Sequence, residues 1–330
     1  MKKITVYDVA REANVSLATV SRVMNGSNVV KEGTRQRVQE AITKLGYRPN
    51  AIAQGLALQR TTSIGLIFPD SINLTGQLLN GLCDVAKIYN YSITLHTVSE
   101  GINDIGEIID EVIKSRVDGV IMYTNKNLDD STDLLSQYNI PLVVVGNRFS
   151  TNQLCTVFVD YAKAVEEKVN EYLDRGIKDI IVLEDRRNRN ITNDMIIGGT
   201  HAFQKHGLDF DNYLEYSNDE RSTYKYLRSY FKIHKACKLI IVSRDSQALA
   251  VLNAARENNI KIPEEMEVIC LNDSKYCSMI RPKISGFVIP TYDLGAVAMR
   301  VMTKMLQGET VEEKQKVLGY LYRGRESTKE

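Results

Sequence analysis

Apolar residues in the first fifty positions recur at helical spacing in three short stretches. A capping box of Thr5 and Asp8 precedes an i, i+3, i+4, i+7 apolar stripe, which predicts a first helix. Ser16 follows a short break and is a good N-cap for a second helix over residues 17 to about 25. A third helix is expected at 32–45, where a glycine ends it. The predicted inward positions are Val6, Val9, Ala10, Ala13, Val20, Val23, Met24, Val38, Ala41, Ile42 and Leu45.

From residue 63 onwards, short apolar runs alternate with amphipathic helices. This alternation is typical of doubly wound parallel sheets, in which helices cover both faces of the strands. Nine strands over about 265 residues predict two subdomains with a cleft between them. Ligands of such sheets bind beyond the carboxyl ends of the strands. The predicted strands are 63–70, 92–98, 117–124, 141–147, 155–160, 179–185, 238–245, 267–273 and 285–290.

Charge is distributed unevenly along the chain. The formal net charge is only +1, but residues 1–60 hold ten Lys and Arg against four acidic residues, which gives +6 there and leaves −5 for residues 61–330. A basic head on a mildly acidic body fits a nucleic-acid contact that is confined to one end. A solvated basic face would have the same composition, so charge alone leaves both interpretations open.

The sequence contains few other motifs that indicate a function. It contains no P-loop, no GxSxG and no GxGxxG motif, and none of its four histidines has a neighbour at metal-ligand spacing, so we expect no enzyme, cofactor or metal site. The five cysteines are odd in number and lack a CxxC pair, which favours reduced core residues of a cytoplasmic protein. No leader and no run of ~18 apolar residues is present. The basic run at 186–189 fits either an anion-binding loop or, preferably, a solvated loop.

The three predicted helices form a helix-turn-helix, whose second helix enters the major groove of DNA with its N-terminal residues against base edges. Ala18, Thr19 and Ser21 are small enough for close approach. Arg22 has the length and geometry to contact a guanine with two hydrogen bonds. A three-helix packing unit without a ligand is the alternative that the pattern leaves open.

Two segments, TVYDVAREANVSLATVSRVMNG and LGYRPNAIAQGLA, resemble the head of the LacI/GalR family of regulators. The resemblance implies a DNA-binding domain at 1–48 and a hinge at 49–61, with a hinge helix that folds only on operator DNA. A helix of eight or nine residues is not stable alone in water, because its nucleation is costly. Leu56 of each subunit is then expected to enter the minor groove and kink the duplex. The implied DNA-binding residues are Thr5, Tyr7, Ser16, Leu17, Ala18, Thr19, Ser21, Arg22, Asn25, Tyr47, Asn50, Ala53, Gln54, Leu56 and Ala57.

The same resemblance implies that residues 62–330 form a core like that of periplasmic sugar-binding proteins. Its N-subdomain would comprise about 62–160 and 290–320, and its C-subdomain about 161–289 and 321–330. Sugar-responsive members carry an Arg where this chain has Met195, and their cleft acids are largely replaced here, so a small sugar bound in the usual way is not expected. The implied effector-cleft residues are Asn147, Arg148, Arg244, Asp245 and Asn272.

The segment RPKISGFVIPTYDLGAVAMRVMTKML and the final RGRESTK resemble the catabolite-control branch of this family, in which the corepressor is the phosphocarrier HPr phosphorylated on serine. On the predicted helix of this segment, Asp293, Val297, Arg300 and Lys304 are spaced by +4, +3 and +4 residues and therefore share one face. An Arg and a Lys one turn apart suit a phosphoserine. Leu17 and Gln54 depart from the branch, so operator preference is expected to differ. The implied corepressor residues are Asp84, Tyr89, Tyr292, Asp293, Val297, Arg300 and Lys304.

These observations together predict a homodimeric, sequence-specific transcription regulator, expected to act as a repressor, that binds a pseudo-palindromic operator in double-stranded DNA. Serine-phosphorylated HPr is the expected corepressor. A repressor that responds to a small sugar or sugar phosphate is the nearest alternative. A solute-binding module is the alternative from another class, and the basic head argues against it.

Overall fold

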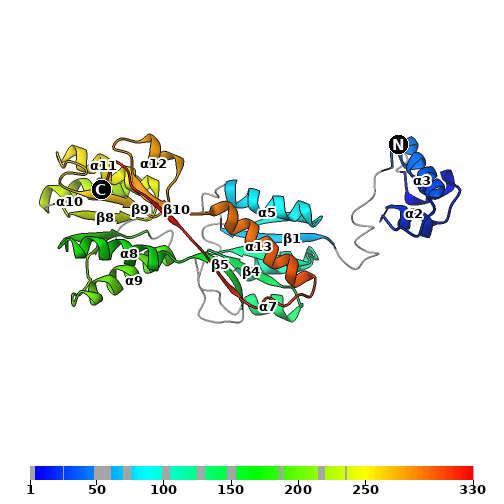
Figure 1. Cartoon of the computed structure of the whole chain (residues 1–330), viewed down its shortest axis with the longest axis horizontal. Helices are drawn as coiled ribbons and strands as arrows, with labels where there is room; N and C mark the ends of the chain where they lie inside the picture. The colour runs from blue at the N-terminus through cyan, green and yellow to red at the C-terminus, as the bar shows by residue number, and fades with distance from the viewer. Residues whose placement is uncertain are drawn as a thin grey trace. The chain divides into compact units, whose positions relative to one another are not determined.

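A computed structural model describes residues 4–24, 26–47, 61–69, 76–98, 105–124, 131–146, 154–185, 189–214, 220–234 and 236–329 (Figure 1). The chain divides into two compact units, residues 1–62 and residues 63–330. No helix in these described ranges combines the length and the apolar character that a membrane crossing requires.

The first unit is a three-helix head built from α1 (Val6–Glu12), α2 (Leu17–Met24) and α3 (Glu32–Leu45). The Asp8 carboxylate accepts a hydrogen bond from the backbone N–H of Thr5 at 2.9 Å, which is the side-chain-to-N-cap half of the predicted capping box, and a second one from the Thr5 hydroxyl at 2.7 Å. Gly46 ends α3 with a φ of 60°, a left-handed conformation that glycine adopts readily. The predicted inward residues form the core, in which Val6, Met24, Ile42 and Leu45 are only half-buried.

The first sheet of the second unit has six parallel strands in the order β11-β5-β4-β3-β1-β2. Alternate strand residues face opposite sides, and each side buries its own apolar cluster. Helices α5 (Gly76–Ile88) and α13 (Thr291–Leu306) cover one side, and α6 (Ile105–Lys114) and α7 (Ser131–Gln137) cover the other. The strands are β1 (Ser63–Pro69), β2 (Ser92–Val98), β3 (Gly119–Tyr123), β4 (Leu142–Val145), β5 (Cys155–Val159) and β11 (Gln315–Leu318).

The second sheet has six strands in the order β12-β10-β9-β8-β6-β7. One side packs against α8 (Tyr161–Asp174) and α9 (Arg189–Lys205). The other packs against α10 (Glu220–Ile233), α11 (Asp245–Glu257) and α12 (Lys275–Met279). The strands are β6 (Ile180–Leu183), β7 (Tyr213–Leu214), β8 (Leu239–Val242), β9 (Glu267–Cys270), β10 (Ser285–Val288) and β12 (Leu321–Arg323).

The structure confirms the nine predicted strands, although most are shorter than the apolar runs that predicted them. It adds β7, β11 and β12, which the apolar pattern does not reveal. The predicted parallel sheets are confirmed, with one antiparallel pair at an edge of the second sheet, where β12 pairs with β10. The chain passes between the two sheets after β5, β10 and β11. All five cysteines are free thiols, and four of them are buried.

Candidate nucleic-acid interface

The second helix of the head, α2, has one side exposed to solvent. Ser16 caps its N-terminus, because the Ser16 hydroxyl accepts a hydrogen bond from the backbone N–H of Thr19 at 3.2 Å. Val20 and Val23 are buried in the core of the head, which leaves the opposite side of the helix in contact with water. This side carries the predicted contact residues Leu17, Ala18, Ser21 and Arg22, and Thr19 beside them is half-buried.

Arg22 is the exposed cation of this helix face. In the part of the chain that the structure describes, its guanidinium has no ion-pair partner, so its donors are available to a ligand. Ala18 and Ser21 have short side chains, which permits close approach to a base edge. Among the other predicted contacts, Thr5 and Tyr7 are exposed at the start of the head and Tyr47 is half-buried at its end.

Six predicted DNA-binding residues lie outside the described part of the chain. They are Asn25 at the end of the second predicted helix and the hinge residues Asn50, Ala53, Gln54, Leu56 and Ala57. The hinge helix and the minor-groove wedge therefore stay predictions. Most of the basic run at 186–189 also lies outside the described residues, apart from Arg189, which begins α9 and is exposed.

In the first sheet, helices α5 and α13 cross in direct backbone contact. A Cβ on Gly81 would overlap the carbonyl oxygen of Tyr292, and a Cβ on Gly295 would overlap that of Leu78. The two glycines therefore allow the helices to approach more closely than any other residue would. Figure 1 shows α5 and α13 side by side over the same sheet.

Predicted corepressor residues lie on both helices of this crossing. The Tyr292 hydroxyl donates a hydrogen bond to the Asp84 carboxylate at 3.2 Å, and the Lys87 ammonium lies 3.5 Å from that carboxylate. Desolvation and the hydrogen bond to Asp84 raise the pKa of Tyr292. The remaining predicted residues are Tyr89, exposed just after α5, and on α13 the exposed Asp293, Arg300 and Lys304 with the half-buried Val297.

An ion pair joins the segments that follow β6 and β8 in the second sheet. The Arg244 Nε atom lies 3.1 Å from Oδ2 of Asp185, whose side chain is 3% exposed. The Ser243 hydroxyl donates to the same carboxylate at 2.8 Å. The Gln247 side chain accepts from the backbone N–H of Ser243 at 3.0 Å and donates to the carbonyl of Glu184 at 3.0 Å. These polar groups therefore bind one another at the edge where a ligand of this fold is expected.

Two of the other four predicted effector residues lie in the described part of the chain. Asp245 accepts a hydrogen bond from the Ser274 hydroxyl at the start of α12, and Asn272 is half-buried after β9. Asn147 and Arg148 lie outside the described residues. The sequence prediction missed Asp185 as a site residue. Its position directly after an apolar strand is the signal that would have identified it.

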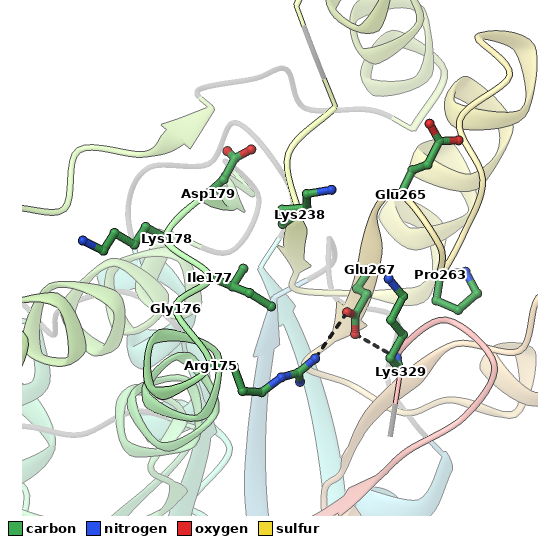
Figure 2. Close-up of a pocket in the computed structure, with 10 residues that line it drawn as sticks. All are labelled: Arg175, Gly176, Ile177, Lys178, Asp179, Lys238, Pro263, Glu265, Glu267 and Lys329. Atoms are coloured by element: carbon green, nitrogen blue, oxygen red, sulfur yellow. Dashed lines mark hydrogen bonds and ion pairs between the residues drawn. The ribbon is translucent and has the colours of Figure 1, made fainter.

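A pocket of about 490 Å³ lies at the amino ends of β6, β8 and β9, away from this edge (Figure 2). The buried Glu267 carboxylate lines it and accepts hydrogen bonds from the Tyr172 hydroxyl at 2.7 Å and the backbone N–H of Lys329 at 2.8 Å. Figure 2 also shows the Arg175 guanidinium, 3.9 Å from the other carboxylate oxygen. Burial and the neighbouring carboxylate raise the pKa of Tyr172. Glu267 therefore anchors the C-terminal residues to β9, which is a structural role.

A helix-turn-helix head with an exposed recognition helix, followed by a two-sheet α/β core, defines a DNA-binding transcription regulator. Family comparison agrees for both units. The model of bacterial regulatory proteins of the lacI family matches residues 5–50, and that of the periplasmic binding protein-like domain matches residues 169–328. The chain belongs to the LacI family of transcription regulators.

Two curated relatives match the chain over nearly its full length. Catabolite control protein A of Staphylococcus aureus is 34% identical over 329 residues, which are 99% of each chain. The HTH-type transcriptional regulator pepR1 of Lactobacillus delbrueckii subsp. lactis is 36% identical over 334 residues, which are 98% of each chain. These relatives are regulators and not enzymes, as the sequence predicts for this chain.

Solved structures confirm the predicted fold class. The lac repressor dimer bound to operator and an anti-inducer superposes with a TM-score of 0.87 at 21% identity, covering 99% of each chain. The transcription regulator CcpA of Lactococcus lactis superposes with a TM-score of 0.70 at 25% identity, covering 82% of this chain and 100% of that one.

Proposed function

We propose that the chain is a homodimeric repressor of the catabolite-control type, which binds a pseudo-palindromic operator and takes serine-phosphorylated HPr as its corepressor. The observation that carries the DNA-binding role is the exposed face of α2 on a packed three-helix head. Our proposed domains are 1–48 for DNA binding, 49–61 for the hinge and 62–330 for the core. The core divides into an N-subdomain (62–160 and 290–320) and a C-subdomain (161–289 and 321–330).

Each subunit contributes one recognition helix and one hinge to the operator complex. The two copies of α2 enter successive major grooves, where Arg22 reads a guanine in each half-site. The paired Leu56 side chains enter the minor groove at the centre of the palindrome and kink it. A hinge of this length gains its helical order from the DNA, because a helix this short does not form alone in water.

Exposed apolar side chains support the homodimer. Leu249 on α11 and Tyr276 and Met279 on α12 are 43%, 53% and 67% exposed. In the first sheet, Leu95 is exposed on β2, which is an edge strand, and Ile88 is exposed at the end of α5. A second copy of the chain that covers these side chains removes apolar surface from water on both sheets.

Two findings support serine-phosphorylated HPr as the corepressor. Catabolite control protein A of S. aureus matches the whole chain, so the core and the head are both similar to this regulator. The exposed Arg300 and Lys304 lie one turn apart on α13, where a planar guanidinium and an ammonium suit a phosphoserine. Asp84 and Tyr292 are held together beside them by their hydrogen bond.

A metabolite-responsive repressor is the second candidate function, and the Asp185–Arg244 pair argues against it. A neutral sugar at this edge must displace Arg244 from a carboxylate that is almost fully buried. Removing the cation from a buried carboxylate costs about 1–3 kcal/mol, which the sugar must supply from its own contacts. A protein corepressor that binds at α5 and α13 does not meet this cost.

The deciding experiment is a fluorescence-anisotropy titration of a catabolite-responsive palindromic duplex with the full chain. It is run with and without serine-phosphorylated HPr, at fixed near-physiological salt because phosphate contacts make the affinity salt-dependent. We expect phosphorylated HPr to tighten binding and unphosphorylated HPr to have no effect. A duplex that binds with no response to HPr would reject the corepressor and leave the DNA-binding role intact.

A charge-removal pair adds a matched control. Replacing Arg300 and Lys304 by alanine should abolish the response to phosphorylated HPr and leave the HPr-independent affinity for DNA unchanged. Lys114→Ala removes an exposed cation from α6, on the other side of the same sheet, and should respond like the parent. A full response in the α13 variant would show that HPr docks elsewhere.

A further inference from the structure

Helix α10 of the second sheet presents a row of cations to solvent. The buried side of the helix consists of Thr223, Leu227 and Phe231, which pack into the core of the second sheet. The opposite side carries cations whose spacing of +4, +3 and +4 aligns them in one row about 16 Å long. This row, called here the α10 stripe, consists of the exposed residues Arg221, Lys225, Arg228 and Lys232.

The α10 stripe is positively charged, although the rest of the second unit is acidic overall. Residues 61–330 have a formal charge of −5, yet this one helix face carries four positive charges. Arg228 is the member with an assigned ion pair, since its Nε atom lies 2.6 Å from the Glu257 carboxylate. Among the described residues, no carboxylate lies within ion-pair distance of the other three cations. The stripe therefore has charge available for an external anionic partner.

One border of the stripe is a groove of about 420 Å³ between α10 and α11. It is lined by Tyr224, Asn253, Arg256 and Glu257. The Tyr224 hydroxyl donates a hydrogen bond to Glu257, the same carboxylate that holds Arg228. This contact fixes an aromatic ring and a guanidinium at the rim of the groove, and such pre-ordered side chains lose little entropy when a partner binds.

Apolar and aromatic residues occupy the end and the inner side of α10. Ile233, at the C-terminal end of the helix, is 79% exposed. The rings of Tyr226, Tyr230 and His234 stack at i, i+4 and i+8, with centroid distances of 5.9 and 4.4 Å, and the two tyrosines pack against the core of the second sheet. The surface that α10 offers to a partner is therefore the basic stripe, with the exposed Ile233 at its C-terminal end.

We propose that the α10 stripe docks an acidic segment of a partner protein. Carboxylates of the segment pair with Lys225 and Lys232, and an apolar side chain of the segment covers Ile233. Duplex DNA fits this surface less well, because an exposed isoleucine offers its phosphates no hydrogen bond. The surface lies in the second unit of the chain and shares no residue with the proposed corepressor surface on α5 and α13.

A labelled acidic peptide tests this proposal on the full chain. The probe is a fluorescein-labelled peptide of repeated Asp-Leu-Glu units, whose binding is followed by anisotropy at about 50 mM and about 200 mM salt. Lys225→Glu combined with Lys232→Glu should weaken binding by about tenfold or more at the lower salt. Lys114→Glu combined with Lys178→Glu makes the same change in net charge elsewhere and should shift the affinity by less than about twofold. Ile233→Ser should weaken the binding that persists at the higher salt, where charge attraction is screened.

Three results would overturn the proposal. If the peptide responded only to net charge, the Lys225→Glu, Lys232→Glu variant and the Lys114→Glu, Lys178→Glu control would lose the same affinity for it. A peptide with serine in place of leucine would bind as tightly as the original if no apolar contact were made. A random-sequence duplex would lose as much affinity as the peptide in the stripe variant if the surface recognised nucleic acid. All variants exchange exposed side chains, so unchanged melting curves establish that folding is intact.

Discussion

Replacing Gly81 by alanine tests the helix crossing on which the proposed corepressor surface rests. The added Cβ would overlap the carbonyl oxygen of Tyr292 and lie 2.9 Å from the backbone nitrogen of Ala296. Both obstacles are backbone atoms of a packed helix, which cannot rotate away as a side chain can. Overpacking of this kind costs about 1–3 kcal/mol, and we expect the upper part of this range.

The assay is calorimetric melting of the full chain beside a matched control. Gly76 begins the same helix, and a Cβ there meets no atom within 4 Å, so Gly76→Ala should be neutral or stabilise by up to about 1 kcal/mol. A loss of 1 kcal/mol lowers the melting temperature of a unit of this size by about 2–4 °C, so a loss of about 2–3 kcal/mol in Gly81→Ala should lower the core transition by about 4–12 °C. The head is a separate compact unit, and its own transition should not move.

Two outcomes would refute this reasoning. If Gly81→Ala melts like Gly76→Ala, α5 and α13 do not approach through their glycines. If Gly81→Ala lowers the core transition but the protein still responds fully to phosphorylated HPr below that transition, the crossing is structural and the corepressor binds elsewhere.

Four further predictions test separate parts of the molecule. Arg22→Ala should weaken operator binding by about 1–3 kcal/mol and blur discrimination at one base pair per half-site, and anisotropy with single-base operator variants would reveal an error if affinity did not change. Leu56→Ala should reduce the bend of the operator, and an unchanged bend in a gel-phasing assay rejects the wedge. Arg244→Ala leaves the Asp185 carboxylate without its cation and should destabilise the core by about 1–3 kcal/mol in urea unfolding. Adding Asp185→Ala should recover part of this loss, and strictly additive losses would show that the two groups do not interact. A hydrogen bond from Lys205 of α9 is the main reason that the pKa of Glu166 is lowered in the folded chain. The ionised Glu166 carboxylate therefore stabilises the fold above about pH 4.5, and this stabilisation is lost as the pH falls through the folded-state pKa. Glu166→Gln should therefore flatten the acid side of the stability profile, and a profile parallel to that of the parent would contradict the assignment.

Local signals explain why the helices of the head were predictable from sequence. The capping residues Thr5, Asp8 and Ser16 act within three or four positions of one another, and their hydrogen bonds form as expected. Gly46 ends α3 through its own backbone conformation. The central strands were predictable for a similar reason, because burial on both faces requires a continuous apolar run.

The strands that sequence reasoning missed are edge strands. β11 lies at one edge of the first sheet, and β7 and β12 lie at the two edges of the second. An edge strand pairs on one side only and stays partly in water, so it does not need an unbroken apolar run. β11 reads Gln-Lys-Val-Leu and is nowhere fully buried, and β7 has only two residues. Their pairing depends on the fold around them and leaves little trace in hydrophobic periodicity.

Long-range pairs at the candidate sites were also beyond the local pattern. Asp185 and Arg244 meet because β6 and β8 are neighbours in the sheet, and nothing in the sequence near either residue specifies that strand order. The hydrogen bond between Asp84 and Tyr292 joins residues that are 208 positions apart. Resemblance to the family implied that these two residues act together, while periodicity could only indicate which helix face each one occupies.

The internal ion pair and the crossings between the sheets constrain how an effector can act. Helix α13 begins directly after the crossing that follows β10, and the Tyr320 hydroxyl at the crossing after β11 donates to Glu167 of α8 at 2.7 Å. Tyr161, at the crossing after β5, packs against the cores of both sheets. A partner that binds α13 therefore acts on an element continuous with the connections between the sheets. A ligand shifts a conformational equilibrium only by its differential affinity for the two states. Because the Asp185 carboxylate is already paired with Arg244 and accepts a hydrogen bond from Ser243 at this edge of the second sheet, we infer that this differential affinity arises at α5 and α13, which is the surface suited to a phosphorylated protein.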